Sequence, residues 1–519
     1  METNVKSPQA IFALPQQMIV PIYQRHYVWE EEHQWEPLWQ DILRVCELRL
    51  SGQATITHFL GAVVIQSQQT SVGALQQHEV IDGQQRLTTL QLLMDAATAA
   101  LDEADEERLA RRLESLTHNA EHFVQPGESP LKLRHSNSDR DSFDAVMTAP
   151  VPIDYDSLPG HRPKAAHKFF ADRVRGWLGD PEESQFKDRA ETLVAVLESG
   201  LQLVVIGLEV HENSQAIFET LNARGTPLTS ADLIKNFIFQ RLAAEGADTA
   251  AAYANEWPFD TSWWEQEVAV GRHNVSRSSL FFGQWLVART GIEYSPSLTF
   301  NRFKKYVEHD QVDSMTELLS QIRASATQYR EWELRSQDPV ADLDPVTMCL
   351  YRMRCMDTEV LRPVLIWLAE RQASSATIGA VVAAAESYLV RRSMLRLAIG
   401  NVRKVMADLI TQTSRLGDHE LGAGVRSYLS SLDSESNYWP GDAEIRRELA
   451  EMPAYNRYSR ARLRMLLEAA EDHLRGYSSR NPKSEKPCAA QGLSDRTPSP
   501  SEVDQPLACR GLGSRDRSS

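Results

Sequence analysis

The sequence is short of the features that mark secreted, membrane and zinc-binding proteins. Its 519 residues include only five cysteines, and none forms a CxxC pair or lies near histidines at zinc-finger spacing. The N-terminus has no basic region followed by a long apolar run, and no stretch reaches the roughly 18 uninterrupted apolar residues of a membrane-spanning helix. We therefore expect a reduced, cytoplasmic protein that does not enter a membrane.

Positive charge is also scarce. The chain has 55 lysines and arginines against 71 acidic residues, so its formal net charge is −16. This balance argues against a broad basic surface for nucleic acid, although a local cluster of arginines can coexist with an acidic exterior. A GxxxxGK[ST] run is absent as well, which excludes a P-loop as a nucleotide site. Any contact with DNA or phosphate must then be local.

Strand-like runs are concentrated in the first half of the chain. Short segments rich in β-branched residues lie at 18–23, 58–66, 78–81 and 201–210. Helical patterns accompany them at 35–48, 85–101, 106–116, 165–178 and 187–197. Helical spacing dominates after about residue 245, and beyond Gly476 the chain becomes rich in Ser and Pro without apolar periodicity. We predict an α+β domain over residues 10–245, an all-α helical domain over 246–476 and a disordered tail over 477–519.

The segment VIDGQQRLTTL gathers polar residues at a strand-to-helix junction. Asp82 is a natural helix N-cap at the end of the strand-like run, and Gly83 permits a tight turn close to a ligand. Gln84, Gln85 and Arg86 would occupy the first helical turn, whose unpaired N–H groups attract an anion. Arg86 adds donors suited to a phosphate. A purely structural reading is equally open, with a capping aspartate and with both glutamines and the arginine facing water.

A second polar junction is PIYQRHYVW. It places Gln24 and Arg25 directly after a strand-like run, and Tyr27 and Trp29 follow in a loop-like stretch. These two aromatic residues either line a pocket or pack in the core. Arg25 is the sharper candidate for a ligand contact.

A third polar junction is LNARGTPLTSADLIKN. Residues 222–225 (Asn-Ala-Arg-Gly) interrupt an amphipathic helix that starts near Asn213, and Thr229 with Asp232 forms a capping-box-like start for the next helix. The structural alternative is a helix end followed by a loop, with Lys235 and Asn236 in solvent.

Taken together and in this order, these segments resemble the N-terminal domain of GmrSD-type restriction enzymes. Those enzymes are bacterial defence proteins that act against phage DNA bearing modified bases, or backbone phosphorothioate in a related branch. The resemblance covers about residues 10–245. It implies a ParB/sulfiredoxin-like core with a small mixed sheet, which binds and hydrolyses a nucleoside triphosphate such as GTP, ATP or CTP together with Mg²⁺.

The resemblance also assigns roles residue by residue. It implies a nucleotide-binding set of Gln24, Arg25, Asp82, Gly83, Gln84, Gln85, Arg86, Asn222 and Arg224. Within this set Asp82, Gln84 and Gln85 are the catalytic candidates, because a glutamine near a γ-phosphate can orient the attacking water and an aspartate can help to hold a metal ion. Which glutamine acts is open, and further metal ligands are unknown.

The end of the sequence departs from the family. Full-length members continue into an HNH nuclease, whose histidine base should follow the last helical segment. Here the last histidine is His473, and residues 477–519 contain none. We therefore expect no nuclease centre on this chain, and we interpret the tail as a truncated or out-of-frame remnant.

Two functional hypotheses follow. The first is an NTP-binding, NTP-hydrolysing sensor domain of a modification-dependent restriction system, with a nuclease partner supplied in trans as one way to complete it. The second is a non-catalytic DNA-binding or partner-binding regulator of the ParB-like type. The sensed modification and the oligomeric state are not defined by the sequence.

Overall fold

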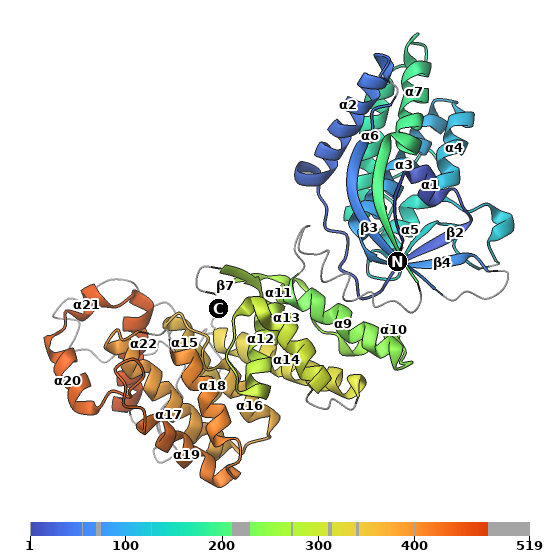
Figure 1. Ribbon diagram of the computed structural model, residues 1–519. Coiled ribbons are helices and arrows are strands. Elements are labelled where there is room, and N and C mark those ends of the chain that lie inside the picture. The colour runs from blue at the N-terminus through green and yellow to red at the C-terminus, as the bar shows by residue number, and fades with distance from the viewer. Residues whose placement is uncertain are drawn as a thin grey trace, which may run out of the picture. The chain divides into compact units, whose positions relative to one another are not determined.

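The computed structural model describes the chain with gaps (Figure 1). The described residues are 2–53, 55–68, 74–125, 127–209, 229–270, 273–309, 314–338, 342–398 and 401–475. The predicted helix from Asn213, the segment at 222–225 and the predicted tail at 477–519 lie outside them. Two units are distinguished, one made of Met1–Trp257, Val270–Ser276 and Lys304–Leu319, the other of Pro258–Ala269, Arg277–Phe303 and Ser320–Ser519.

A six-stranded mixed sheet is the framework of the first unit (Figure 1). Its strands are β1 (Glu2–Lys6), β2 (Gln16–Val20), β3 (His58–Ser67), β4 (Gln76–Asp82), β5 (Leu133–His135) and β6 (Leu201–Leu208), in the spatial order β1-β6-β3-β4-β2-β5. Strands β4 and β5 both pair in parallel with β2, whereas β3 is antiparallel to β4. The carboxyl ends of β2, β4 and β5 therefore lie at one edge of the sheet.

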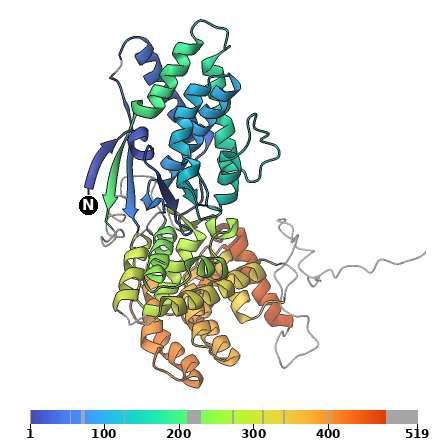
Figure 2. The same cartoon turned by 90° about the vertical axis from the view of Figure 1, so that its right-hand side faces the viewer.

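Helices gather on one face of this sheet (Figure 2). Those between β1 and β6 are α1 (Pro8–Phe12), α2 (Glu36–Leu50), α3 (Gln84–Glu103), α4 (Glu107–Thr117), α5 (Arg140–Met147), α6 (Arg162–Leu178) and α7 (Phe186–Ala195), with π-helical turns at Glu31–Trp35 and Val196–Gly200. Buried residues, polar as well as apolar, occur on every side of helix α3, so it lies inside the layer of helices. These elements confirm the predicted α+β class.

Helices dominate the second half of the chain, as predicted. They are α9 (Ser230–Ala244), α10 (Thr249–Glu256), α11 (Ser262–Glu265), α12 (Arg277–Thr290), α13 (Thr299–His309), α14 (Met315–Gln337), α15 (Pro345–Cys355), α16 (Arg362–Glu370), α17 (Ser375–Met394), α18 (Val402–Thr413), α19 (Asp418–Ser430), α20 (Asp442–Glu451), α21 (Ala454–Arg457) and α22 (Arg460–Arg475). The all-α expectation needs one correction, since two short strands, β7 (Glu267–Val270) and β8 (His273–Ser276), also occur there. A core formed by residues such as Cys349, Leu365, Tyr388, Leu409 and Val425 holds α15 to α19 together.

The described helices include none that is long and apolar enough to cross a membrane.

The turn between β4 and α3 differs from the prediction in one respect. The N-cap position belongs to Gly83, which has φ +88° and ψ 12°, and no side chain caps the helix. Asp82 is not the N-cap, because β4 extends through it and pairs it with Val64 of β3. The reversal into α3 therefore falls on the glycine. A Cβ atom at Gly83 would also lie 2.6 Å from Cγ1 of Val63, so both conformation and space require glycine here.

We predict that Gly83→Ala lowers the free energy of unfolding by about 2–4 kcal/mol, since it combines a left-handed backbone with a steric clash. Gly176→Ala is the matched control, because Gly176 lies inside α6 and a Cβ atom there would meet no other atom within 4 Å. That control should be neutral or stabilising. Urea denaturation of both variants measures the difference, and equal stabilities would contradict the interpretation of the turn.

Candidate functional site

Three polar segments meet at the edge formed by the carboxyl ends of β2, β4 and β5. The loop at 21–29 follows β2, the Asp-Gly-Gln-Gln-Arg junction at 82–86 follows β4, and a segment at 136–140 follows β5. Two of these segments were predicted from the sequence. The structure brings them into direct contact.

The two glutamines of the junction hold the loop after β2 through its backbone. The Nε2 of Gln84 donates to the carbonyl of Arg25 at 2.9 Å. The Nε2 of Gln85 donates to the carbonyl of His26 at 3.1 Å, while its Oε1 accepts from the N–H of Val28 at 2.9 Å. Both side chains are buried, with 7% and 9% of their surface exposed. The alternative in which the glutamines face water is therefore wrong.

Gln24 anchors the other end of the same loop. Its Nε2 donates to the carbonyl of Ile81, the residue just before the junction, at 3.1 Å. The side chain is buried. Gln24 therefore connects the loop to β4, and any contact it makes with a nucleotide would compete with this hydrogen bond.

Two further residues, which the sequence motifs do not include, complete this network. The Nδ2 of Asn137 lies 3.3 Å from the carbonyl of Gln24 and 3.4 Å from that of Arg25. The carboxylate of Asp139 accepts from the N–H of Tyr27 at 2.6 Å, and burial raises its pKa. The polar run HSNSDR was the available signal, but β5 before it is only three residues long and gives no recognisable strand pattern.

The two aromatic residues of the loop, Tyr27 and Trp29, differ in burial. Tyr27 is core, with its hydroxyl 2.7 Å from Oγ1 of Thr89 and accepting from Nε1 of Trp35 at 2.8 Å. Trp29 is only half-buried and borders a cavity of about 200 Å³ that Arg86 also lines. Of the two predicted alternatives, packing in the core therefore applies to Tyr27 and lining a pocket applies to Trp29.

Charge at the junction centres on Asp82. Burial raises the pKa of this carboxyl group, while the N–H of Gly83 and then the guanidinium groups of Arg86 and Arg25 lower it. Arg86 is half-buried, and its Nη1 donates to the carbonyl of Ala62 at 3.0 Å. The side chain of Arg25 is also half-buried and has no hydrogen bond or ion pair with any residue that the structure describes. Arg25 is therefore available to an anionic ligand.

Gly61 of β3 allows Arg86 to lie against the sheet. It has φ +103°, and a Cβ atom there would come within 3.1 Å of Nε of Arg86. The register between β3 and β6 also shifts at this point. The bulged glycine thus makes room for the guanidinium beside the first turn of α3.

The start of α3 leaves donors unused. The first hydrogen bond of the helix runs from Leu87 N–H to Gly83 O, and the N–H groups of residues 84–86 have no acceptor among the described residues. The Oε1 of Gln84 likewise has no partner there, whereas both polar atoms of Gln85 are engaged. The junction can therefore offer backbone donors and one amide oxygen to a ligand.

The third predicted junction is seen only in part. Asn222 and Arg224 lie outside the described residues, so their predicted contacts are still predictions. Asp232 forms the predicted capping box with Thr229 at the start of α9. Lys235 and Asn236 are each only 4% exposed, which contradicts the alternative that placed them in solvent. The reason is packing, since Lys235 lies over the rings of Tyr253 and Trp257.

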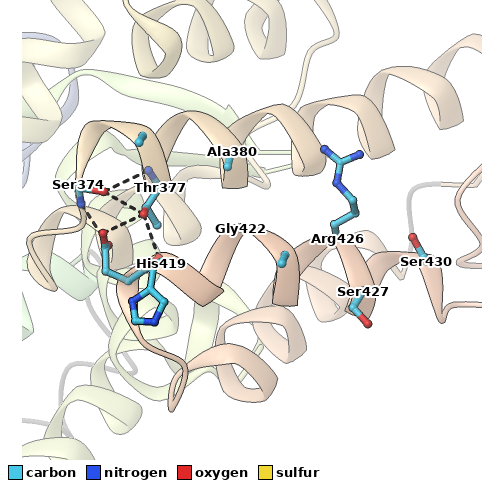
Figure 3. Close-up of a pocket in the computed structure, with 11 residues that line it drawn as sticks. Ser374, Thr377, Ala380, His419, Gly422, Arg426, Ser427 and Ser430 are labelled. Carbon is cyan, nitrogen blue, oxygen red and sulfur yellow. Dashed lines mark hydrogen bonds between the residues drawn. The ribbon is translucent and has the colours of Figure 1, made fainter.

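A larger hollow, about 840 Å³, opens on helices α17 and α19 of the second unit (Figure 3). Ser374 and Thr377 form one hydrogen-bonded cluster there with the carboxylate of Asp418, and Arg426 stands apart from that cluster. A Cβ atom on Gly422 would lie 2.7 Å from Cβ of Ala380, so small residues allow the two helices to pack closely. None of the predicted site residues borders this hollow.

Comparison with known families agrees with the motifs. Residues 9–239 match the model of the family described as GmrSD restriction endonuclease, N-terminal domain. This region is therefore similar to the GmrSD N-terminal domain. The match includes the loop after β2, the Asp-Gly-Gln-Gln-Arg junction and the segment after β5. No curated protein matches the chain.

The residues of this region are compatible with the metal that the family resemblance implies. The described residues contain no group of three or more His, Cys, Asp or Glu side chains arranged to hold a metal ion. Mg²⁺ bound with a nucleotide needs only one or two carboxylates, because phosphate oxygens and water supply the other ligands. Asp82, between the cations of Arg25 and Arg86, is the carboxylate that fits this requirement.

We predict that Gln85→Ala speeds hydrogen exchange of the Val28 amide by about 2- to 10-fold, since the hydrogen bond to Oε1 is lost. The Tyr27 amide, which donates to Asp139, is the internal reference and should keep its protection. Exchange measured by NMR or mass spectrometry distinguishes the two amides. Unchanged exchange at Val28 would contradict the proposed attachment of the loop.

Proposed function

We propose that this GmrSD N-terminal domain binds a nucleoside triphosphate at the carboxyl edge of β2, β4 and β5, and acts as the sensor part of a restriction-type defence protein. The observation that carries the proposal is the combination of unused donors there. The N–H groups of residues 84–86 and the guanidinium of Arg25 have no partner among the described residues. Backbone donors at a helix start together with an arginine suit a phosphate group.

The local charge supports the same ligand. The chain has a formal net charge of −16, so an anion is repelled by most of its surface. At the junction, Arg25 and Arg86 both act on the carboxyl group of Asp82. Two guanidinium groups thus act on this one half-buried carboxylate, which leaves an excess of positive charge around Asp82. This excess charge favours a polyphosphate over a neutral ligand.

The junction also suggests how hydrolysis would be assisted. When bound, Mg²⁺ would neutralise charge on the phosphates, with Asp82 as its protein ligand. Gln84 is the better of the two glutamine candidates for orienting an attacking water, because its Oε1 is unused, whereas Gln85 spends both polar atoms on the loop. Arg25 would contact the phosphates, since its side chain has no competing partner among the described residues.

We predict that Arg25→Ala weakens nucleotide binding by about 10- to 100-fold, the effect of losing one charge-assisted hydrogen bond. The thermal unfolding temperature should change little, because the side chain of Arg25 has no hydrogen bond or ion pair with a described residue. Arg111→Ala on α4 is the matched control, since Arg111 forms only an exposed ion pair with Glu107. Calorimetric titration with GTP, ATP and CTP measures the affinities, and wild-type affinity in Arg25→Ala would exclude the site.

We predict that Gln84→Ala lowers kcat for phosphate release by about 100-fold while the KM changes much less, as expected for a residue that positions the nucleophile. Asn137→Ala is the control, because it removes another amide donor from the carbonyl of Arg25, whereas the Oδ1 of Asn137 already accepts from the N–H of Asp139. Equal loss of kcat in both variants would assign Gln84 to loop attachment alone.

The same assays test the DNA-binding hypothesis. Salt-sensitive binding of DNA without phosphate release from any nucleotide would support a non-catalytic regulator. Stimulation of phosphate release by modified DNA would support the sensor.

A further inference from the structure

The cavity beside Arg86 extends the candidate site. Its volume is about 200 Å³, and it lies between α2, β3 and the first two turns of α3. Arg86 and Leu90 form its wall on α3, and Trp29 forms the wall on the loop after β2. The cavity and the proposed phosphate site therefore share one residue, Arg86, and one loop.

Size limits what the cavity can hold. Pockets for whole drug-sized ligands are about 300–1,000 Å³, so 200 Å³ suits a single ring system and not a complete nucleotide. Residues 84 and 90 are separated by about 9 Å along a helix that rises 1.5 Å per residue. This separation is comparable to that between the phosphates and the base of a nucleotide. A ligand with its phosphates at the start of α3 can thus reach the cavity with its base.

The walls of the cavity suit a flat aromatic ring. Trp29 is half-buried, and Phe59 of β3 is 59% exposed although it is large and apolar. An aromatic side chain beside a cavity provides a stacking surface for a base.

The polar rim adds a preference among bases. The carboxylate of Asp41 lies on the rim, 3.3 Å from Nη2 of Arg44 and 3.5 Å from Nε2 of His58. An ionised carboxylate only accepts hydrogen bonds, and these two contacts leave acceptor positions unused. It therefore favours a base that presents an exocyclic amino group over one that presents only carbonyl oxygens.

We propose that this cavity binds the nucleobase of the bound nucleotide, by stacking against Phe59 and Trp29, and that Asp41 selects bases with an exocyclic amino group. The inference rests on the proposed nucleotide-binding function. It adds a base subsite and a source of nucleotide preference to the phosphate site.

The test compares a nucleotide with a base-free probe. Phe59→Ala should weaken CTP binding at least about fivefold, the lower end of base stacking on an aromatic side chain, and should leave inorganic tripolyphosphate binding unchanged. Phe123→Ala is the matched control, because Phe123 is 44% exposed on a different part of the unit. Phe59 is exposed, so its substitution should leave the fold intact. A second variant, Trp29→Leu, tests the cavity wall that is formed by the loop after β2.

Asp41→Asn tests the preference for bases with an exocyclic amino group. Wild type should bind CTP more tightly than UTP, and the ratio of the two affinities should fall towards one in the variant. An unchanged ratio would overturn the role of Asp41.

Failure of the base subsite and failure of the nucleotide site give different results. CTP affinity equal to wild type in both Phe59→Ala and Trp29→Leu, with weakened binding in Arg25→Ala, would overturn the base subsite and leave the phosphate site standing. Parallel losses for CTP and tripolyphosphate in Phe59→Ala would also overturn it, because they would indicate a general disturbance. Absence of binding by the wild-type protein to every nucleotide would overturn both proposals.

Discussion

The attachment of one loop to the start of α3 is the interaction on which the candidate site depends. Two buried glutamine side chains hold the backbone of the loop after β2 at the carbonyls of Arg25 and His26. A buried amide side chain without partners would cost about 1–3 kcal/mol, so these hydrogen bonds are required once the residues are buried. The sheet makes the contact geometrically available, because β2 and β4 are adjacent and parallel and their following segments start side by side.

The network also bears on the proposed anion site of this acidic protein. Arg25 projects its guanidinium from a loop whose backbone is already held, so little further ordering is needed when a ligand binds. The positive charges of Arg25 and Arg86 offset the negative charge of Asp82. Arg25 and Arg86 thus place positive charge at this edge of the sheet, in a chain whose formal net charge is −16.

The sequence predicted the strongly patterned elements and missed some of the short ones. Helix α3 and strand β6 were found because their apolar patterns extend over many residues, whereas β5 has three residues and α5 has eight, and neither was predicted. The sequence also showed that the first two junctions, after β2 and after β4, are rich in polar residues. Their contacts could not be predicted, because the amide of Gln85 meets the backbone of Val28, 57 positions away, only through the pairing of β2 with β4.

The N-cap prediction for Asp82 failed for the same reason, because the local sequence does not show how strands pair. An aspartate before a helix is a good N-cap on local grounds, but here it belongs to β4 and is paired with β3 through Val64. The strand continues because a left-handed glycine follows it, and this frees the carboxylate from capping. A capping aspartate would have spent its oxygens on the N–H groups of the first turn of α3. With Gly83 at the N-cap, the N–H groups of residues 84–86 have no acceptor among the described residues, and the carboxylate of Asp82 accepts from the N–H of Gly83, so the glycine belongs to the candidate site as well as to the turn.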